Sequence, residues 1–395
     1  MNQPEDWEVI ILGAGASGLM CAATAASRGR RVLVVDHARR AGEKIRVSGG
    51  GRCNFTHLDA APHHYLTTDP DFVRAVLNHL PPEAFLARLR RHGIQTVEKT
   101  PGQLFCADSA ERIVSMLLQE CQKGRVRLLL DHAIQQIQPQ ASGFQVVTNR
   151  GTWTTQALVV ALGGCSMPKL GASSLGYTLA RQFGLKVGPI RPGLTPLTFD
   201  ATLRALCQEL TGIALQATLE CAGMRFTDDL LFTHRGLSGP AVLQISSYWR
   251  PGMELRIDLT PGRDLLSLLA QAKTEEPGIF LRTFLSRFLP KRLAMQRILQ
   301  AGGDGRLAEI GDRRLRVLAD LVNRWTLTPN GTGGFERAEV TVGGVATAEM
   351  DPATLACRKH PGLHFIGELL DVTGWLGGYN LQWAWSSGHA AGLAV

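Results

Sequence analysis

A glycine-rich turn near the N-terminus constrains the fold of this chain more than any other feature. Residues 8–12 are an apolar run of the kind buried in a parallel sheet, and they lead directly into Gly13, Ala14, Gly15, Ala16, Ser17 and Gly18. In this GxGxxG pattern, Gly13 permits the tight turn and Gly15 lets backbone amides approach a pyrophosphate. Gly18 lets the helix expected over 19–27 pack against the strand. The turn therefore predicts phosphate binding at the N-terminus of this helix.

The residues that follow complete a dinucleotide-binding unit. A second apolar strand is expected over 31–35, and it ends in Asp36, where an acid binds the ribose of an adenosine. A GxGxxG alone is weak, because it can be no more than a turn that packs a helix on a strand. The order of strand, glycines, helix, strand and acid is far more specific and predicts an α/β Rossmann domain.

A polar, glycine-rich segment over 42–54 favours FAD as the nucleotide. Its three consecutive glycines free the backbone to wrap closely around a flat ligand. Lys44 and Arg52 carry charge suited to a diphosphate or to an electron-rich ring. The alternative is a flexible surface loop. The cofactor contacts expected here are Lys44, Ser48, Gly49, Gly50, Gly51, Arg52, Cys53 and Asn54.

Short strand signals alternate over 125–162 and predict a β-meander that returns to the nucleotide-binding sheet. Its last strand, 157–162, runs into two glycines. A chain that returns in this way is typical of FAD domains of the glutathione-reductase type. The cofactor contacts expected on this part of the chain are Ile134, Ala161, Gly163 and Gly164.

The C-terminal residues are expected to close the same pocket. A strand over 363–366 is followed by a glycine and acids, and a glycine pair then opens a helix that runs to Val395. Amides at the start of this helix present a positive end that suits the flavin edge where negative charge gathers on reduction. The contacts expected here are Gly367, Glu368, Asp371, Gly378, Tyr379, Asn380 and Leu381.

These motifs together resemble one family. The chain carries GxGxSG, then GxKxxxSGGGRCNxT from Gly42 to Thr56, then LFTHRGLSGP over 231–240, and GELLD and GGYNLQ over 367–382. It is similar over nearly its whole length to the YhiN/BaiN group of bacterial FAD-binding oxidoreductases, often described as aminoacetone oxidase-like. The resemblance implies amine oxidation or reduction of an enone. The chain departs from the family pattern at Leu162, where threonine is usual, and at Leu175, where the usual acid of a cofactor loop is missing.

The resemblance and a change in composition near residue 190 imply three parts. The FAD-binding domain is expected over 1–190 and 340–395. A small β-barrel is expected over 191–260 and 325–339, and a helical insert over 261–324. The expected fold class is thus α/β, a glutathione-reductase-type Rossmann domain with an inserted β-barrel and a helical insert.

Most of the positive charge falls in the helical insert. The chain carries a net charge of +8, and residues 280–324 hold ten basic against four acidic residues. Clustered cations of this kind can bind nucleic acid or an acidic partner. Because no aromatic stacking platform accompanies them, a solvated helix face is the favoured interpretation. Nucleic acid is therefore not expected as a partner, and the alternative function is a flavin-containing protein that binds nucleic acid or another partner through this insert.

The expected activity is hydride transfer between FAD and a small organic substrate of the amine or enone type. The chain has no second GxGxxG at a strand-to-helix turn, so any NAD(P)H is expected to bind only transiently. Oxidase and reductase remain open. His234 is the candidate acid or base, because imidazole titrates near neutrality, and a structural role in a barrel loop is its alternative. No metal is expected, since His63 and His64 lack neighbours at ligand spacing.

The eight cysteines include no CxxC pair, which fits a reduced, cytoplasmic protein. Residues 9–27 are uncharged and could be mistaken for a membrane span or a signal peptide. Acidic residues precede this stretch and glycines interrupt it, so no membrane association is expected. The sequence makes no prediction of the oligomeric state.

Overall fold

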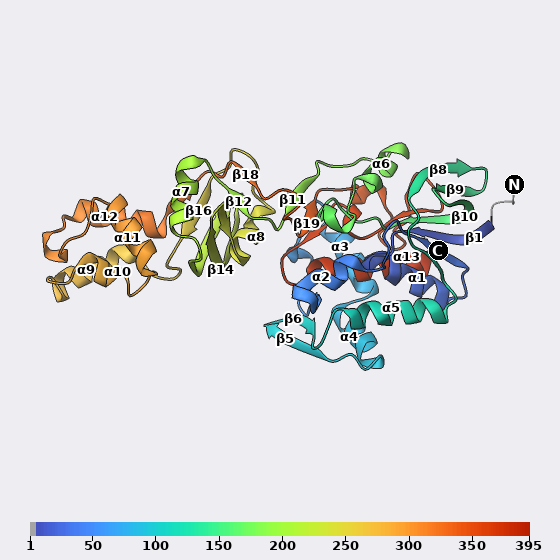
Figure 1. Ribbon diagram of the computed structural model, residues 1–395, viewed down its shortest axis with the longest axis horizontal. Helices are drawn as coiled ribbons and strands as arrows, with labels where there is room; N and C mark the ends of the chain where they lie inside the picture. The colour runs from blue at the N-terminus through green and yellow to red at the C-terminus, as the bar shows by residue number, and fades with distance from the viewer. Residues whose placement is uncertain (1–4) are drawn as a thin grey trace. The chain divides into compact units, whose positions relative to one another are not determined.

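The computed structural model describes residues 5–395, which divide into two compact units (Figure 1). The first unit runs to Arg191 and resumes from Val340 to Val395, and the second spans Pro192–Glu339. No helix among the described residues is long and apolar enough to cross a membrane.

A seven-stranded sheet forms the centre of the first unit, in the order β7-β2-β1-β10-β9-β8 with β20 also paired to β10. The strands β7, β2, β1, β10 and β20 run parallel to one another, whereas β9 and β8 are antiparallel. Their bounds are β1 Glu5–Leu12, β2 Val32–Val35, β7 Arg127–Leu129, β8 Ile134–Gln140, β9 Gly143–Thr148, β10 Gly151–Val160 and β20 Leu363–Phe365.

The predicted meander is partly corrected by this sheet. Its first strand, β7, pairs with β2 at the edge of the sheet and takes no part in the meander. The meander proper is β8, β9 and β10, and β10 is one continuous strand of ten residues through Val160. Residues 9–12 and 158–160 are fully buried and lie in register, so the parallel centre of the sheet is apolar on both faces.

Helices α1 (Ala16–Ser27) and α13 (Tyr379–Ala394) pack closely on each other, and α1 also lies against β1 and β2. Small residues make the approach possible. A Cβ on Gly388 of α13 would overlap the carbonyl oxygen of Ser17, and one on Gly392 would lie 2.8 Å from the carbonyl oxygen of Cys21. The first helix of the chain is therefore packed directly on the last helix.

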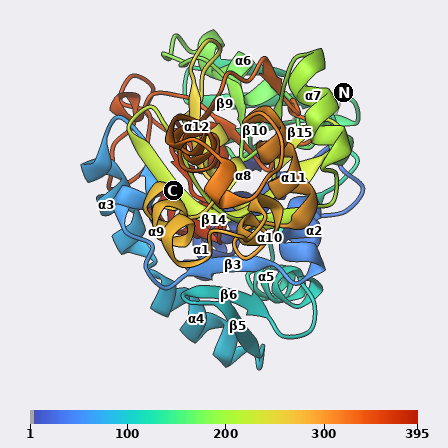
Figure 2. The ribbon, with the colours of Figure 1, turned by 90° about the vertical axis from the view of Figure 1, so that its left-hand side faces the viewer.

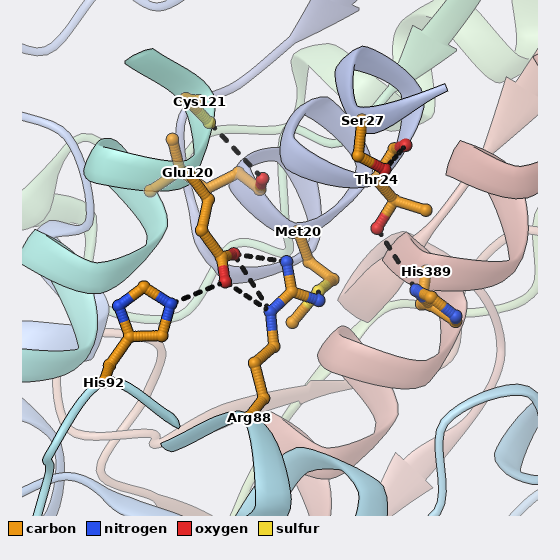
Figure 3. A network of polar contacts seen from close by, with 9 residues as sticks. Met20, Thr24, Ser27, Arg88, His92, Glu120, Cys121 and His389 are labelled. Carbon is orange, nitrogen blue, oxygen red and sulfur yellow. Dashed lines mark hydrogen bonds and ion pairs between the residues drawn. The ribbon is translucent and has the colours of Figure 1, made fainter. Parts of the chain in front are cut away.

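A polar network ties α1 to its other neighbours (Figure 3). Arg88 donates to both carboxylate oxygens of Glu120, and a ring nitrogen of His92 lies 2.9 Å from Glu120 Oε1. Arg88 also contacts the sulfur of Met20 on α1. One turn further along α1, Thr24 Oγ1 lies 3.1 Å from His389 Nδ1 of α13. Arg88 and Glu120 are mostly buried, so each depends on the other for compensation of its charge.

The remaining elements of the first unit surround the sheet. A small sheet orders as β3-β6-β5, and β21 pairs with β4. The bounds are α2 Glu43–Gly51, β3 Asn54–His57, β4 Tyr65–Leu66, α3 Pro70–His79, α4 Pro82–Arg91, β5 Thr96–Thr100, β6 Gln103–Cys106, α5 Glu111–Lys123, α6 Leu175–Gln182, β19 Val340–Val342 and β21 Thr373–Gly374. Strand β11 (Arg191–Gly193) leads along the chain toward the second unit.

The second unit, all of which the structure describes, holds one antiparallel sheet in the order β17-β16-β13-β14-β15-β12-β18. Its strands are β12 Leu197–Thr198, β13 Ala214–Cys221, β14 Met224–Thr233, β15 Gly236–Ser238, β16 Leu255–Asp258, β17 Trp325–Leu327 and β18 Gly331–Thr332. Helices α7 (Ala201–Glu209) and α8 (Pro240–Ser246) accompany the sheet.

A group of helices lies between β16 and β17 in the chain, and Figure 2 looks onto it. The helices are α9 Leu265–Glu275, α10 Leu281–Leu285, α11 Lys291–Gln300 and α12 Asp312–Asn323. Arg297 of α11 is fully buried, with its guanidinium 3.7 Å from the centre of the Trp325 ring. Burial lowers the pKa of Arg297 to about 9. Part of the positive charge counted in this segment is thus internal and unavailable to a partner.

Candidate flavin site

The first glycine turn has the geometry of a phosphate cradle. Gly13 adopts a φ of +107°, and a Cβ there would overlap the carbonyl oxygen of Ala161 at the end of β10. A Cβ on Gly18 would overlap the carbonyl oxygen of Gly13, so both residues must be glycine. Gly15 differs, because no atom lies within 4 Å of the position its Cβ would take. The start of α1 therefore faces open space, as the binding of a pyrophosphate requires.

Asp36 closes one side of this cradle. Its Oδ2 accepts a hydrogen bond from the amide of Ala14 at 2.6 Å, and its Oδ1 accepts one from the amide of Ala38 at 2.7 Å. The carboxylate is thereby fixed beside the turn. The segment that leads to Ile134, the first residue of β8, runs alongside, since the amide of His132 donates to the carbonyl oxygen of Asp36. Both predicted nucleotide contacts thus lie on the same edge of the sheet.

The glycine-rich segment over 42–54 is largely a broken helix, and not the flexible loop that was its alternative interpretation. Helix α2 is interrupted at Ser48, Gly49 and Gly50, and the two glycines have φ values of +56° and +66°. Nothing lies within 4 Å of the Cβ position of Gly50, so this break also borders open space. Cys53 is fully buried with a φ of +52°, and burial raises its pKa to about 12. It is therefore a packed thiol and not a nucleophile.

Lys44 and Glu368 form the polar centre of the site. Lys44 Nζ donates to Glu368 Oε2 at 3.0 Å and to Ser166 Oγ at 3.0 Å. Glu368 Oε1 accepts from Ser166 Oγ at 3.0 Å and from the amide of Thr341 at 2.8 Å. Burial raises the pKa of Glu368, but Lys44 and these hydrogen bonds outweigh it and hold that pKa below its usual value. Lys44 is thus paired within the protein, although its charge was expected to act on the cofactor.

The N-terminus of α13 lies against strand β3, which follows the broken helix. A Cβ on Gly378 would lie 2.5 Å from the carbonyl of Thr56 and 2.8 Å from Asn54 Oδ1. Asn54 donates from Nδ2 to Gln103 Oε1 at 3.2 Å, whereas its buried Oδ1 has no hydrogen-bond partner among residues 5–395. An orphaned buried oxygen beside a helix N-terminus fits a group that a ligand completes. Asn380 holds the preceding turn through Gly374 and Trp375.

The four predicted motifs converge on one place in the first unit. Gly13 and Gly18 lie against Ala161, and a Cβ on Gly367 would lie 2.6 Å from Ser17 Oγ. A Cβ on Gly164 would lie 2.7 Å from Glu368 Oε1, and Gly163 lies nearby. The open glycines, the fixed Asp36 and the unsatisfied Asn54 fit FAD.

The remaining predicted site residues lie in surroundings that do not identify a cofactor contact. Asp371 Oδ2 is 3.7 Å from the Cβ position of Gly188, and burial raises its pKa while Arg191 opposes the shift. The side chain of Arg52 is exposed, and Leu381 packs against the core. Tyr379 stacks on His57 with ring centres 4.6 Å apart. His234 belongs to the second unit, where it is exposed and lines a cavity.

Several residues of the site escaped the sequence analysis. Ser166 and Thr341 carry no motif, and only their contacts with Glu368 give them a role. Asp59 was also missed: it lies close to His63 and His64, with one ligand atom of each within 4.8 Å of the others. The premise that these two histidines lack a neighbour is therefore wrong, although Asp59 and His63 are exposed.

Comparison with known structures defines the class. The chain superposes with a TM-score of 0.52 on the 3-ketosteroid-Δ4-(5α)-dehydrogenase of Rhodococcus jostii RHA1, over 100% of this chain and 98% of that one, at 13% identity. The fold is the α/β Rossmann type of FAD-dependent oxidoreductases. The family model described as "HI0933-like protein Rossmann domain" matches residues 7–394, so the chain belongs to this family of flavoprotein oxidoreductases and is an enzyme. The resemblance to the YhiN/BaiN group is confirmed.

Three relatives are similar over most of this chain. A "Ribosomal RNA dihydrouridine synthase" of Escherichia coli K12 is 47% identical over 98% of this chain and 97% of its own length. A protein of the same name from Haemophilus influenzae is 45% identical over 98% of both chains. A "3-dehydro-bile acid delta(4,6)-reductase" of Clostridium scindens is 30% identical over 98% of both.

Proposed function

We propose that this protein reduces uridine in ribosomal RNA to dihydrouridine, using FAD held by the converged motifs of the first unit. The observation that carries the proposal is the similarity along the whole chain to two ribosomal RNA dihydrouridine synthases, at 47% and 45% identity. The open glycine cradle supports the cofactor, and the relatives support the substrate.

The chemistry of the relatives favours the enone alternative over amine oxidation. The C5=C6 bond of uracil is conjugated with the C4 carbonyl, and the name of the bile acid reductase likewise places its double bonds next to a 3-oxo group. Reduction adds a hydride at C6 and a proton at C5, so the two electrons must come from a reductant such as NAD(P)H. Bound FAD supplies the hydride.

The residues of the first unit bind and orient the cofactor in this proposal. The amides at Gly15 hold the pyrophosphate, and Asp36 accepts hydrogen bonds from the ribose. The amides of α13 that follow Gly378 stabilise negative charge on the flavin edge. The ion pair of Lys44 and Glu368 keeps two distant segments of the pocket in place, and Asn54 completes its hydrogen bonding on the cofactor.

Under this proposal RNA is the substrate, whereas the sequence analysis did not expect nucleic acid as a partner. The alternative of a protein that binds nucleic acid becomes part of the main proposal, because catalysis and RNA binding belong to one activity. His234 is the proposed donor of the proton to C5, since imidazole can give a proton near neutral pH.

Mass spectrometry of ribosomal RNA tests the proposal. Ribosomal RNA transcribed in vitro carries unmodified uridine, and incubation with the FAD-loaded protein and NADPH or NADH is expected to raise one uridine by about 2 Da, the mass of the two hydrogens added. A primary amine or a steroid enone that is turned over while the RNA stays unchanged would overturn the proposed substrate.

A further inference from the structure

The second unit contains a cavity of about 450 Å³ at the hairpin whose sequence is LFTHRGLSGP, residues 231–240. Strand β14 ends at Thr233, and His234 and Arg235 form the turn into β15. The hydroxyl of Thr233 donates to the carbonyl oxygen of Gly236 at 3.0 Å and accepts from the amide of Arg235 at 3.3 Å. This bonding fixes the turn, so His234 and Arg235 are held at the cavity.

A second arginine, Arg337, also lines the cavity. The amide of Gly333 donates to the carbonyl oxygen of Pro196 at 2.8 Å, which holds the end of β18 against the start of β12. A Cβ on Gly333 would lie 3.0 Å from the Cβ of Arg337, so Arg337 sits directly over this glycine. Both Arg235 and Arg337 line the cavity and are exposed. A ligand can therefore reach them from solvent.

The charge of the cavity is uncompensated. Its lining, all within the described second unit, contains no aspartate or glutamate. Neither Arg235 nor Arg337 forms an ion pair with any residue in the range 5–395. Some exposed arginines of this unit are paired, as Arg225 is with Glu220 at 3.3 Å, whereas others, such as Arg204 and Arg313, have no ion pair among the described residues. What distinguishes Arg235 and Arg337 is that both line one cavity. Two free guanidinium groups at one cavity are typical of a site for phosphate groups.

We propose that this arginine cavity, defined by Arg235 and Arg337, binds a phosphodiester group of the RNA substrate. The inference rests on the proposed reduction of ribosomal RNA and adds to it the place where the RNA backbone is held. The hydroxyl of Ser238 also lines the cavity and offers a neutral donor to a phosphate or ribose oxygen. The pyrophosphate of NAD(P)H shares this chemistry, and the experiment separates the two sources.

The experiment measures the affinity of the FAD-loaded protein for a ribosomal RNA transcript over a series of salt concentrations. Arg235→Gln and Arg337→Gln are each expected to lower the slope of log affinity against log salt by about one and to weaken binding about tenfold at low salt. Arg235→Lys is expected to keep the slope, because it keeps the charge. Arg225→Gln is the matched control, since Arg225 is exposed and lies at the other end of β14.

Two further readouts separate the possible failures. If the glutamine variants bind and reduce the RNA as the unchanged protein does, the cavity is not the phosphate site, while the proposed function stands. If they retain RNA binding but lose bleaching of the flavin by NADPH, the cavity holds the dinucleotide and the inference is overturned. If the unchanged protein neither binds nor reduces the RNA, the proposed function fails and takes the inference with it.

Discussion

Lys44 and Glu368 lie 324 positions apart in the chain, yet Lys44 Nζ donates to Glu368 Oε2 at 3.0 Å. Lys44 stands in the broken helix segment and Glu368 follows the last strand of the sheet, so this one ion pair joins two of the four segments of the flavin site. Ser166 and the amide of Thr341 donate hydrogen bonds to the same carboxylate, so the chain around each of these two residues is also held at the ion pair.

The ion pair gives stability a defined dependence on pH. The pKa of Glu368 is lowered in the folded protein, so its stabilising effect is present above the usual carboxyl pKa of 4.5 and is lost as the pH falls below it. We expect Lys44→Met to lower the free energy of unfolding at pH 7 by about 1–2 kcal/mol. Urea denaturation at pH 7 and pH 4 checks this, with Arg74→Met, in an exposed pair, as control. If Lys44→Met lowers the free energy of unfolding equally at pH 7 and pH 4, the result would argue against a charged pair.

Gly15 should be required for the cofactor but not for folding. No atom lies within 4 Å of its Cβ position, so the valine of Gly15→Val fits the protein and projects into the space assigned to the pyrophosphate. We expect a folded, colourless protein that does not take up FAD. Gly278→Val is the control, because the Cβ position of Gly278 is also open but lies in the second unit. Flavin absorbance after reconstitution measures the difference, and a yellow Gly15→Val protein would refute the assignment of the cradle.

Gly388, in contrast to Gly15, should be required for the stability of the fold. A Cβ there would overlap the carbonyl oxygen of Ser17, so Gly388→Ala must push α13 away from α1. We expect a loss of about 1–3 kcal/mol in the free energy of unfolding, despite the better helix propensity of alanine. Gly311→Ala, at an open position, should change it little. An unchanged midpoint of thermal unfolding for Gly388→Ala would show that the two helices are not in such close contact.

The network of Arg88 and Glu120 is expected to stabilise the packing of α4 and α5 on α1. Glu120→Gln leaves Arg88 mostly buried without its counter-charge, which costs about 3 kcal/mol in comparable sites. The reference substitution is Glu83→Gln, an exposed position on α4. Chemical denaturation measures the free energy of unfolding of both variants. If Glu120→Gln loses as little as Glu83→Gln, water solvates the charge of Arg88.

His234→Gln tests the proposed proton donor. Reduction of RNA should slow at least tenfold, because one acid–base group contributes on the order of a hundredfold or more, while bleaching of the flavin by NADPH should not change. If both rates stay the same, His234 has the structural role that was its alternative.

The nucleotide turn could be predicted from the sequence because its geometry is local. Gly13, Gly18 and Asp36 lie within 24 positions of one another, and each has a steric or hydrogen-bonding role that follows from spacing alone. The same holds for the glycine pair before α13.

The partners of the site could not be predicted in the same way. Nothing in the sequence shows that Lys44 is neutralised by Glu368, since that contact depends on how the whole first unit packs. Ser166 and Thr341 belong to no motif. The helix that is broken at Ser48 resembles a loop in the sequence, because consecutive glycines are found both in loops and at breaks in helices. Asp59 is different, because it lies only four residues before His63, and this local spacing was overlooked.

The most direct test of the central claim is a single turnover without oxygen. The FAD-loaded protein is reduced with one equivalent of dithionite and then mixed with a ribosomal RNA transcript, and flavin absorbance and dihydrouridine are followed together. We expect the yellow colour to return as one dihydrouridine forms per flavin. A flavin that stays reduced with ribosomal RNA, but is reoxidised by a small enone, would contradict the account.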